Sequence, residues 1–127
     1  MELSELRKLA LWRGARRRCP QCGENDLFRR YARLADECPH CGLLLRREQG
    51  AQTGSMYLTA AISQLFACVL IFALWFGTDW SPAMSTAVAL PIVLGICCVL
   101  LPWCQSMWVA VEYVTDAVND EPWVNPR

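Results

Sequence analysis

Four of the eight cysteines stand in two matching pairs. Cys19-Pro-Gln-Cys22-Gly and Cys38-Pro-His-Cys41-Gly repeat one pattern, with fifteen residues between the pairs. Two thiolates at this spacing can bind one ion, because the turn between them brings the sulfurs together and the proline and glycine favour that turn. Two such knuckles complete a tetrahedral four-thiolate site. The pattern therefore predicts one structural zinc ion held by Cys19, Cys22, Cys38 and Cys41.

A four-thiolate site is closed, since it leaves no coordination position for water or substrate. We expect it to stabilise a segment too short to have much core of its own. Iron held by the same thiolates is the alternative metal. His40, the single histidine, lies inside the second knuckle, and we expect it to face solvent. No Ser–His–Asp set, phosphate-binding glycine loop or open metal position is recognisable, so we expect neither an enzyme nor a small-molecule substrate.

Arginines and an aromatic residue surround the predicted metal site. We expect this surface to contact anionic lipid or a larger membrane complex, and it comprises Arg16, Arg17, Arg18, Phe28, Arg29, Arg30 and Arg33. A membrane-tethered nucleic-acid binder is a weaker alternative. Residues 1–50 hold eleven Lys/Arg against seven Asp/Glu, and zinc with four thiolates lowers that net charge of +4 to about +2. Such a field is weak for binding nucleic acid.

The segment before the knuckles has a helical pattern. Residues 2–13 place leucines and a tryptophan at helical spacing with charged residues between them, and Gly14 is the predicted end of the helix. A short basic amphipathic helix of this kind lies on an anionic membrane surface or packs on its own domain. Both interpretations stay open, and the first assigns residues 1–15 to an interfacial helix.

Two charge-free runs follow the cysteines. Residues 57–77 would span about 30 Å as a helix, which is the thickness of the hydrocarbon core of a bilayer. After a polar break, Ser81 is a good N-cap and Pro82 suits the first position of a second helix. Residues 82–111 are again uncharged, and Pro91 and Pro102 predict that this helix bends or breaks. The predicted fold class is a small zinc ribbon of short β-hairpins, followed by an α-helical two-span transmembrane hairpin.

These patterns divide the chain into five parts. They are an interfacial helix (1–15), the ribbon (16–48), a connector (49–55), a transmembrane hairpin (56–112, with spans at about 57–77 and 83–108) and an acidic tail (113–127). No cleavable signal peptide is recognisable. Because the loop at 78–85 lacks Lys and Arg, the positive-inside rule predicts that both ends are cytoplasmic in a bacterial inner membrane. Trp103 and Trp108 would lie at the inner interface, in contact with lipid or a partner.

Other polar and thiol side chains fall inside the predicted spans. Gln64 is expected to form an interhelical hydrogen bond. Cysteine packs well between helices, which is the preferred interpretation of the four cysteines in the spans. A metal- or haem-handling site built from these thiols is the alternative. The residues concerned are Cys68, Cys97, Cys98 and Cys104.

The order of these features resembles a family of bacterial membrane proteins known as domain of unknown function nine-eight-three. The matching pieces cover residues 16–115 and are Arg18-Cys-Pro-x-Cys-Gly, Leu27-Phe28-Arg29, Leu34-Ala35 and Cys38-Pro-x-Cys41-Gly-Leu, then a connector, two spans and a late proline. Members of that family are often encoded beside haem–copper oxidase and its assembly factors. The resemblance therefore implies an accessory subunit or assembly factor of a larger, electron-transfer membrane complex.

Overall fold

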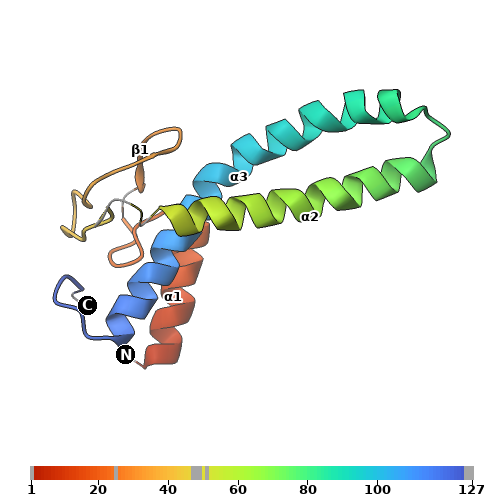
Figure 1. The fold of residues 1–127 in the computed structure, drawn as a ribbon. Coiled ribbons are helices and arrows are strands. Elements are labelled where there is room, and N and C mark those ends of the chain that lie inside the picture. The colour runs from red at the N-terminus through yellow and green to blue at the C-terminus, as the bar shows by residue number, and fades with distance from the viewer. Residues whose placement is uncertain (1, 25, 47–49, 51, 125–127) are drawn as a thin grey trace.

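Three helices and a small antiparallel hairpin make up the fold of the described residues. The computed structural model describes residues 2–24, 26–46, 50 and 52–124. The elements follow in the order α1 (Leu3–Ala15), β1 (Phe28–Arg30), β2 (Arg33–Leu34), α2 (Thr53–Gly77) and α3 (Pro82–Val118). In Figure 1, α2 and α3 form a long antiparallel pair, and the hairpin and α1 gather at the end opposite their connecting loop. The predicted cysteine-bearing hairpin followed by two long apolar helices is confirmed.

Helix α1 packs one side against the last part of α3. Its buried residues are Leu6, Ala10 and Gly14, four apart and so on one side of the helix. A Cβ atom added to Gly14 would lie only 2.5 Å from the Cβ of Ala110. The Ser106 hydroxyl donates a hydrogen bond of 2.7 Å to the carbonyl oxygen of Gly14. Gly14 therefore does not end the helix, as the sequence had suggested, but stands inside it where α1 and α3 touch.

The packing of α1 agrees with one of the two alternatives for this helix, namely that it packs on its own domain. It lies on the chain's own core, and Leu3 and Trp12 remain more than half exposed, at 53% and 54%. Contact of that outer side with a membrane surface stays a prediction.

Helix α2 begins at Thr53, so residues 53–55 of the predicted connector are helical. Its buried face consists of small polar residues, Ser55, Thr59 and Ser63. A hydroxyl group on a helix can donate a hydrogen bond to the backbone carbonyl one turn earlier. The Thr59 hydroxyl donates in this way to the carbonyl oxygen of Ser55 at 2.7 Å. A side chain at Gly54 would overlap the Trp108 ring. The connector is shorter than predicted because Gly54 and Ser55, which suggest a turn in the sequence, lie in the helix and allow a close crossing with α3.

Helix α3 is continuous through both of its internal prolines. Ser81 caps it, accepting a hydrogen bond from the backbone N–H of Met84 at 3.4 Å, and Pro82 is its first residue, as predicted. In Figure 1 the helix first runs beside α2 and then turns to run beside α1. Buried Pro102 has no N–H to donate and its ring crowds the preceding turn, which accounts for the bend. The predicted bend is therefore present without a break.

The end of α3 extends into the predicted tail. Residues 113–118 are helical because Tyr113 is buried, at 3% exposed, and Val114 and Ala117 pack against the same core. Residues 1, 25, 47–49, 51 and 125–127, which fall in the predicted interfacial helix, ribbon, connector and tail, lie outside the described residues.

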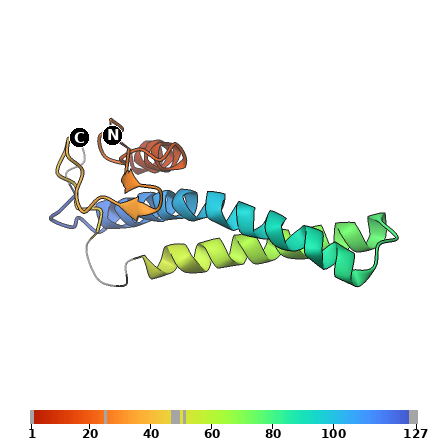
Figure 2. The ribbon, with the colours of Figure 1, turned by 90° about the horizontal axis from the view of Figure 1, so that it is seen from above.

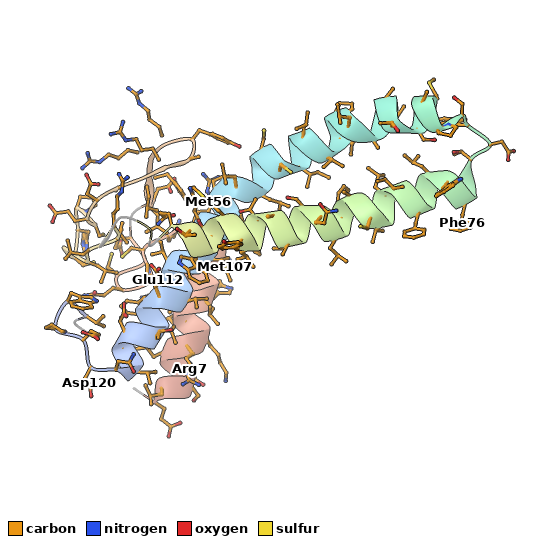
Figure 3. All side chains as sticks on the ribbon, in the orientation of Figure 1. Arg7, Met56, Phe76, Met107, Glu112 and Asp120 are labelled. Atoms are coloured by element: carbon orange, nitrogen blue, oxygen red, sulfur yellow. The ribbon has the colours of Figure 1, made fainter. Side chains whose placement is uncertain are left out.

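A single hydrophobic core joins the cysteine-bearing segment to the helices. It contains residues of α1, of the segment between and after the knuckles, of the end of α3 and of the tail: Leu6, Ala10, Leu27, Leu34, Leu43, Leu45, Val109, Tyr113 and Val124 among others. A short segment that lacks a sufficient core alone thus completes one with α1 and α3. Figure 3 shows nitrogen-tipped side chains gathered at this end, while the paired length of α2 and α3 carries mainly carbon.

Candidate metal centre

The structure brings the four predicted ligands together. All four Sγ atoms lie within 4.8 Å of one another. The Cys19 and Cys41 sulfurs are 3.7 Å apart, and the Cys22 and Cys38 sulfurs are also 3.7 Å apart. A tetrahedral site with metal–sulfur bonds of about 2.3 Å places its sulfurs about 3.8 Å from one another. The distances therefore suit four thiolates around one metal ion, and all four cysteines are free of disulfides.

The two knuckles share one backbone conformation. The Gly23 N–H donates to the carbonyl of Cys19 at 2.8 Å, and the Gly42 N–H donates to that of Cys38 at 2.9 Å. Gly23 has a φ of 72° and Gly42 a φ of 74°. Only glycine takes this left-handed conformation at little cost. The glycine that follows each pair is therefore required by the turn that brings the sulfurs together.

Backbone N–H groups are also directed at the first sulfur of each knuckle. Burial raises the pKa of Cys19 by more than the hydrogen bonds from Cys22 and Gln21 lower it. Burial also pushes the pKa of Cys38 upward, but hydrogen bonds, first those from the backbone of Cys41 and His40, bring it down to about 7. A cation among the four sulfurs would favour their thiolate forms, because metal binding releases thiol protons.

Arg13 attaches the first knuckle to α1. Its guanidinium donates to the carbonyl oxygen of Gln21 at 2.7 Å and to that of Pro20 at 3.2 Å. The backbone of Gly23 passes so close that an added Cβ would lie 2.8 Å from Arg13 Nε. The next residue along the helix, Gly14, touches Ala110 of α3. The metal centre is thus connected to the long helices through two consecutive residues of α1.

The hairpin between the knuckles presents arginines at its tip. Strands β1 and β2 pair antiparallel with Phe28 opposite Leu34 and Arg30 opposite Arg33, and the pairing is irregular between Phe28 and Arg30. Leu34 is buried, whereas Arg29, Arg30 and Arg33 are exposed. The hairpin therefore turns one apolar side to the core and its charges outward.

The remaining arginines of the predicted surface lie nearer to α1. Arg16 places its guanidinium 3.7 Å from the centre of the Trp12 ring, and Arg17 lies 5.0 Å from the centre of the Phe28 ring. Arg18 is exposed and bridges to Asp26 through the backbone. Cation–π contacts of this kind fix the direction of a long side chain. Contact of these residues with lipid or a partner stays a prediction.

The predicted interface tryptophans differ in exposure. Trp103 is 36% exposed. Trp108 is partly buried against Gly54, and its Nε1 donates to a carboxylate oxygen of Glu112 at 2.6 Å. Trp108 therefore contributes to the crossing of α2 and α3 in addition to any contact outside the chain. His40 is exposed, in agreement with the prediction that it faces solvent.

The interhelical hydrogen bond predicted for Gln64 is not made within this pair of helices. The Gln64 side chain is exposed, and within the described part of the chain it forms no hydrogen bond to α3. The buried face of α2 runs through Ser63, and the next residue of a helix points about 100° away from it. Gln64 thus lies on the outer side of the helix pair.

The cysteines of the spans do not gather. Cys104 is fully buried, Cys97 is partly buried, and Cys68 and Cys98 are exposed. Among the described residues, the four ribbon cysteines alone form a group of His, Cys, Asp or Glu side chains that could hold a metal ion. The geometry therefore lends no support to a thiol site in the spans.

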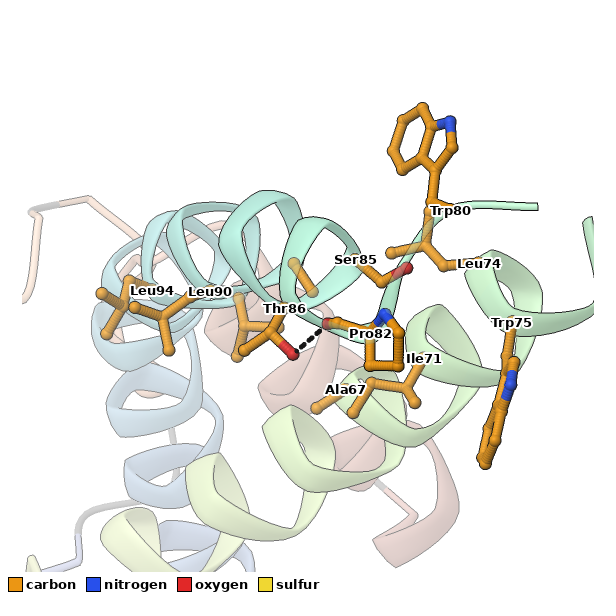
Figure 4. A pocket seen from close by; sticks show the side chains of 12 residues that line it. Ala67, Ile71, Leu74, Trp75, Trp80, Pro82, Ser85, Thr86, Leu90 and Leu94 are labelled. Atoms are coloured by element: carbon orange, nitrogen blue, oxygen red, sulfur yellow. Dashed lines mark hydrogen bonds between the residues drawn. The ribbon is translucent and has the colours of Figure 1, made fainter. Parts of the chain in front are cut away.

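A groove between α2 and α3 lies near their connecting loop, away from the cysteines. It has a volume of about 540 Å³ and is lined by apolar side chains of both helices together with Trp75 and Trp80 (Figure 4). Of its two hydroxyl groups, that of Thr86 donates to the carbonyl of Pro82 at 2.9 Å. None of its lining residues is titratable. The groove therefore offers no acid or base for chemistry.

The two long helices are apolar on their outer surfaces. Phe76 is 85% exposed and Trp75 is 73% exposed, and few residues of the apolar stretch of either helix are buried. A core helix of a water-soluble protein would bury such residues. Both α2 and α3 are long and apolar enough to cross a membrane.

The contacts of Arg13 and Gly14 were not foreseen from the sequence. Arg13 reads as one charge of an amphipathic helix, and no spacing rule connects it to a knuckle seven or eight residues later. A glycine near the end of a helix is typical of a cap, so Gly14 carried a misleading signal. The role of Gly14 depends on the position of α3, almost one hundred residues away in the chain.

Comparison with known protein families gives a match. The family model described as Protein of unknown function (DUF983) matches residues 28–113, which include the hairpin, the second knuckle, α2 and most of α3. The match starts after Cys19 and Cys22, later than the resemblance seen from residue 16. No curated protein and no solved structure matches the chain.

Proposed function

We propose that this chain, which belongs to the DUF983 family matched over residues 28–113, is a non-catalytic membrane protein that acts as an accessory subunit or assembly factor of a larger membrane complex. Its helices α2 and α3 span the bilayer as a hairpin. The cysteine-bearing segment is a zinc ribbon fixed at one end of that hairpin and supplies a docking surface there.

A membrane location is supported by the exposed surface of the helices. Large exposed apolar side chains cover α2 and α3 over most of their length. An apolar surface of this kind is stable in lipid, and a helix satisfies nearly all of its backbone hydrogen-bonding groups internally. Eleven Lys/Arg precede residue 51, and the loop at 78–85 has none. The positive-inside rule then favours a bacterial inner membrane with the ribbon on the cytoplasmic side.

Zinc is the proposed metal. Four thiolates at tetrahedral spacing are its usual structural ligands, and no ligand position is left for a reacting group. Iron accepts the same four thiolates and is the outcome to exclude by metal analysis. In either case, metal binding adds its free energy to the folding of the ribbon.

The observation that carries the proposal is the attachment of the ribbon to the helices. A binding module on a flexible tether would need few contacts with its anchor. Here Arg13 holds the first knuckle, and Gly14 packs against Ala110 of α3. The ribbon therefore keeps one orientation relative to the bilayer, which is what a docking platform on a membrane complex requires.

A partner helix is supported by Gln64. Its polar side chain is exposed on α2, within the charge-free run. A glutamine amide that faces hydrocarbon leaves its donors and acceptors unpaired, and such residues usually hydrogen-bond to another helix. The neighbourhood of haem–copper oxidase that the family resemblance implies makes an electron-transfer complex the proposed partner.

The test is gentle detergent extraction of the tagged protein from native membranes, followed by mass spectrometry, an absorption spectrum and metal analysis of the same sample. We expect a pigmented complex with one zinc per copy. Gln64→Leu should weaken co-purification of the partner, whereas Val69→Leu, at another exposed position of α2, should not. A protein that is recovered alone under all gentle conditions, with no partner captured by cross-linking, would contradict the proposal.

A further inference from the structure

The tip of the β-hairpin places two like charges opposite each other. Arg30 and Arg33 are register partners across the two strands, so their side chains leave the same face. Both are exposed, and neither forms an ion pair with any acidic side chain within the described residues. Like charges directly opposite destabilise a sheet. An anion bound between the two guanidinium groups would relieve that repulsion.

The depth of this tip can be estimated from the helices. Tyr57 lies twenty residues before Gly77 at the end of α2, and Pro102 lies twenty residues after Pro82 at the start of α3. In an antiparallel pair joined by a short loop, these two residues lie at about the same level. Tyr57 is the first residue of the predicted span at 57–77, and tyrosine is typical of the membrane interface, so we place the edge of the hydrocarbon at this level. Cys98 precedes Pro102 by four residues and lies about 6 Å farther into the bilayer.

The tip of the hairpin reaches the part of α3 that contains Cys98. Figures 1 and 2 both show the hairpin beside α3. Tyr31 lies in the turn between Arg30 and Arg33, and its hydroxyl is near the Cys98 thiol. The pKa of Tyr31 is raised, first because its hydroxyl loses part of its hydration and second because the Cys98 thiol is close. The rest of the Tyr31 side chain is 59% exposed. Tyrosine at the boundary between headgroups and hydrocarbon is a common anchor of membrane proteins.

We propose that the hairpin tip, defined as Arg30, Tyr31 and Arg33, lies in the headgroup layer and binds the phosphate of an anionic phospholipid. Guanidinium groups bind phosphate through paired hydrogen bonds, and two of them on one face suit one headgroup. This inference rests on the proposed function in one respect, namely that α2 and α3 span a bilayer. Lipid is favoured over a protein partner because the tip lies at headgroup depth beside the chain's own helix.

The experiment uses the purified full-length protein in neutral detergent. Binding of short-chain dioctanoyl phosphatidylglycerol and of dioctanoyl phosphatidylcholine is measured by titration for the wild type, for Arg30→Gln/Arg33→Gln and for the charge-matched control Lys8→Gln/Arg46→Gln. Both control residues are exposed, and each forms an exposed ion pair, Lys8 with Glu5 and Arg46 with Asp36. A basic residue near an anionic surface contributes about fivefold in affinity, so the arginine pair should supply about a 25-fold preference for phosphatidylglycerol.

The expected result is that Arg30→Gln/Arg33→Gln lowers this preference to within about twofold of unity, while the control keeps most of it. Retained preference in the tip variant, or equal loss in both variants, overturns the proposal. Displacement of the lipid by inorganic phosphate at equal concentration would make the site one for free phosphate and also overturns it. Because the assay uses the isolated chain, it can succeed where partner co-purification fails. Loss of co-purification in the tip variant with unchanged lipid preference would instead assign the tip to a protein partner.

Discussion

Replacing Gly14 by alanine tests whether α1 is packed tightly on α3. The added Cβ would lie 2.5 Å from the Cβ of Ala110, and an ordinary contact begins near 3.4 Å. The two helices would therefore have to separate by about 0.9 Å, since neither Cβ can rotate away. Overpacking of this kind costs about 1–3 kcal/mol. Alanine returns about 1 kcal/mol through its higher helix propensity. We expect a net loss of about 0–2 kcal/mol in the free energy of unfolding.

The assay is denaturant unfolding of the detergent-solubilised protein, followed by tryptophan fluorescence, with Gly95→Ala as the matched control. An added Cβ at Gly95 would meet nothing within 4 Å, so this variant should be as stable as the wild type or slightly more stable. Ala110→Gly in the Gly14→Ala background moves the same methyl from one helix to the other. It should therefore restore part of the lost stability, with a coupling of about 1 kcal/mol.

Tight packing of α1 on α3 is refuted if Gly14→Ala raises the free energy of unfolding, relative to the wild type, as much as Gly95→Ala does. It is also refuted if Ala110→Gly gives the same change in both backgrounds. Either result would mean that α1 does not touch α3 at this point, and that the ribbon is attached more loosely than the structure indicates.

Three further substitutions test other contacts. Gly54→Ala should lower the stability of the helix hairpin by about 1–3 kcal/mol in thermal unfolding, because its side chain overlaps the Trp108 ring, whereas Gly77→Ala, with open space around it, should not. Arg13→Ala removes two charge-assisted hydrogen bonds from the first knuckle and should speed metal release to a chelator by about tenfold or more. The control is Arg7→Ala at an exposed position of α1. Equal rates of metal release in the two variants would contradict the role of Arg13. Leu27→Ala leaves a cavity where the leucine is only 1% exposed, and it should lower the free energy of unfolding in denaturant by about 2–5 kcal/mol. A loss below about 1 kcal/mol would argue against the shared core.

The chemistry and the helices could be predicted because they depend on local patterns. Paired Cys-x-x-Cys spacing with proline and glycine specifies a turn whatever surrounds it, and the four sulfurs meet as expected. A charge-free run long enough to cross a bilayer as a helix likewise predicts a membrane-spanning helix without reference to the rest of the chain. Ser81 and Pro82 mark the start of α3 for equally local reasons.

The differences from the sequence-based expectations have a common physical cause, which is that tertiary contacts override local signals. Gly14 looked like a helix end, and Gly54 lay in a predicted connector, but both are glycines because another helix passes too closely for a side chain. Gln64 faces outward since the contact face of α2 is set by its serines and threonine. Val124 joins the core with Tyr113, although the tail was noted only for its acidic charge. Such pairings join residues far apart in the sequence, and no periodicity reveals them.

The central claim is that a bound metal holds a ribbon whose core is shared with α1 and the end of α3. Amide hydrogen exchange of the full-length protein, measured with its metal and after removal of the metal by a chelator, tests it most directly. The account predicts that removal increases exchange in residues 19–45, in Leu3–Ala15 and in the last turns of α3, and leaves Thr53–Gly77 protected. Increased exchange confined to residues 19–45, or a purified protein that contains no metal and shows the same protection, would contradict it.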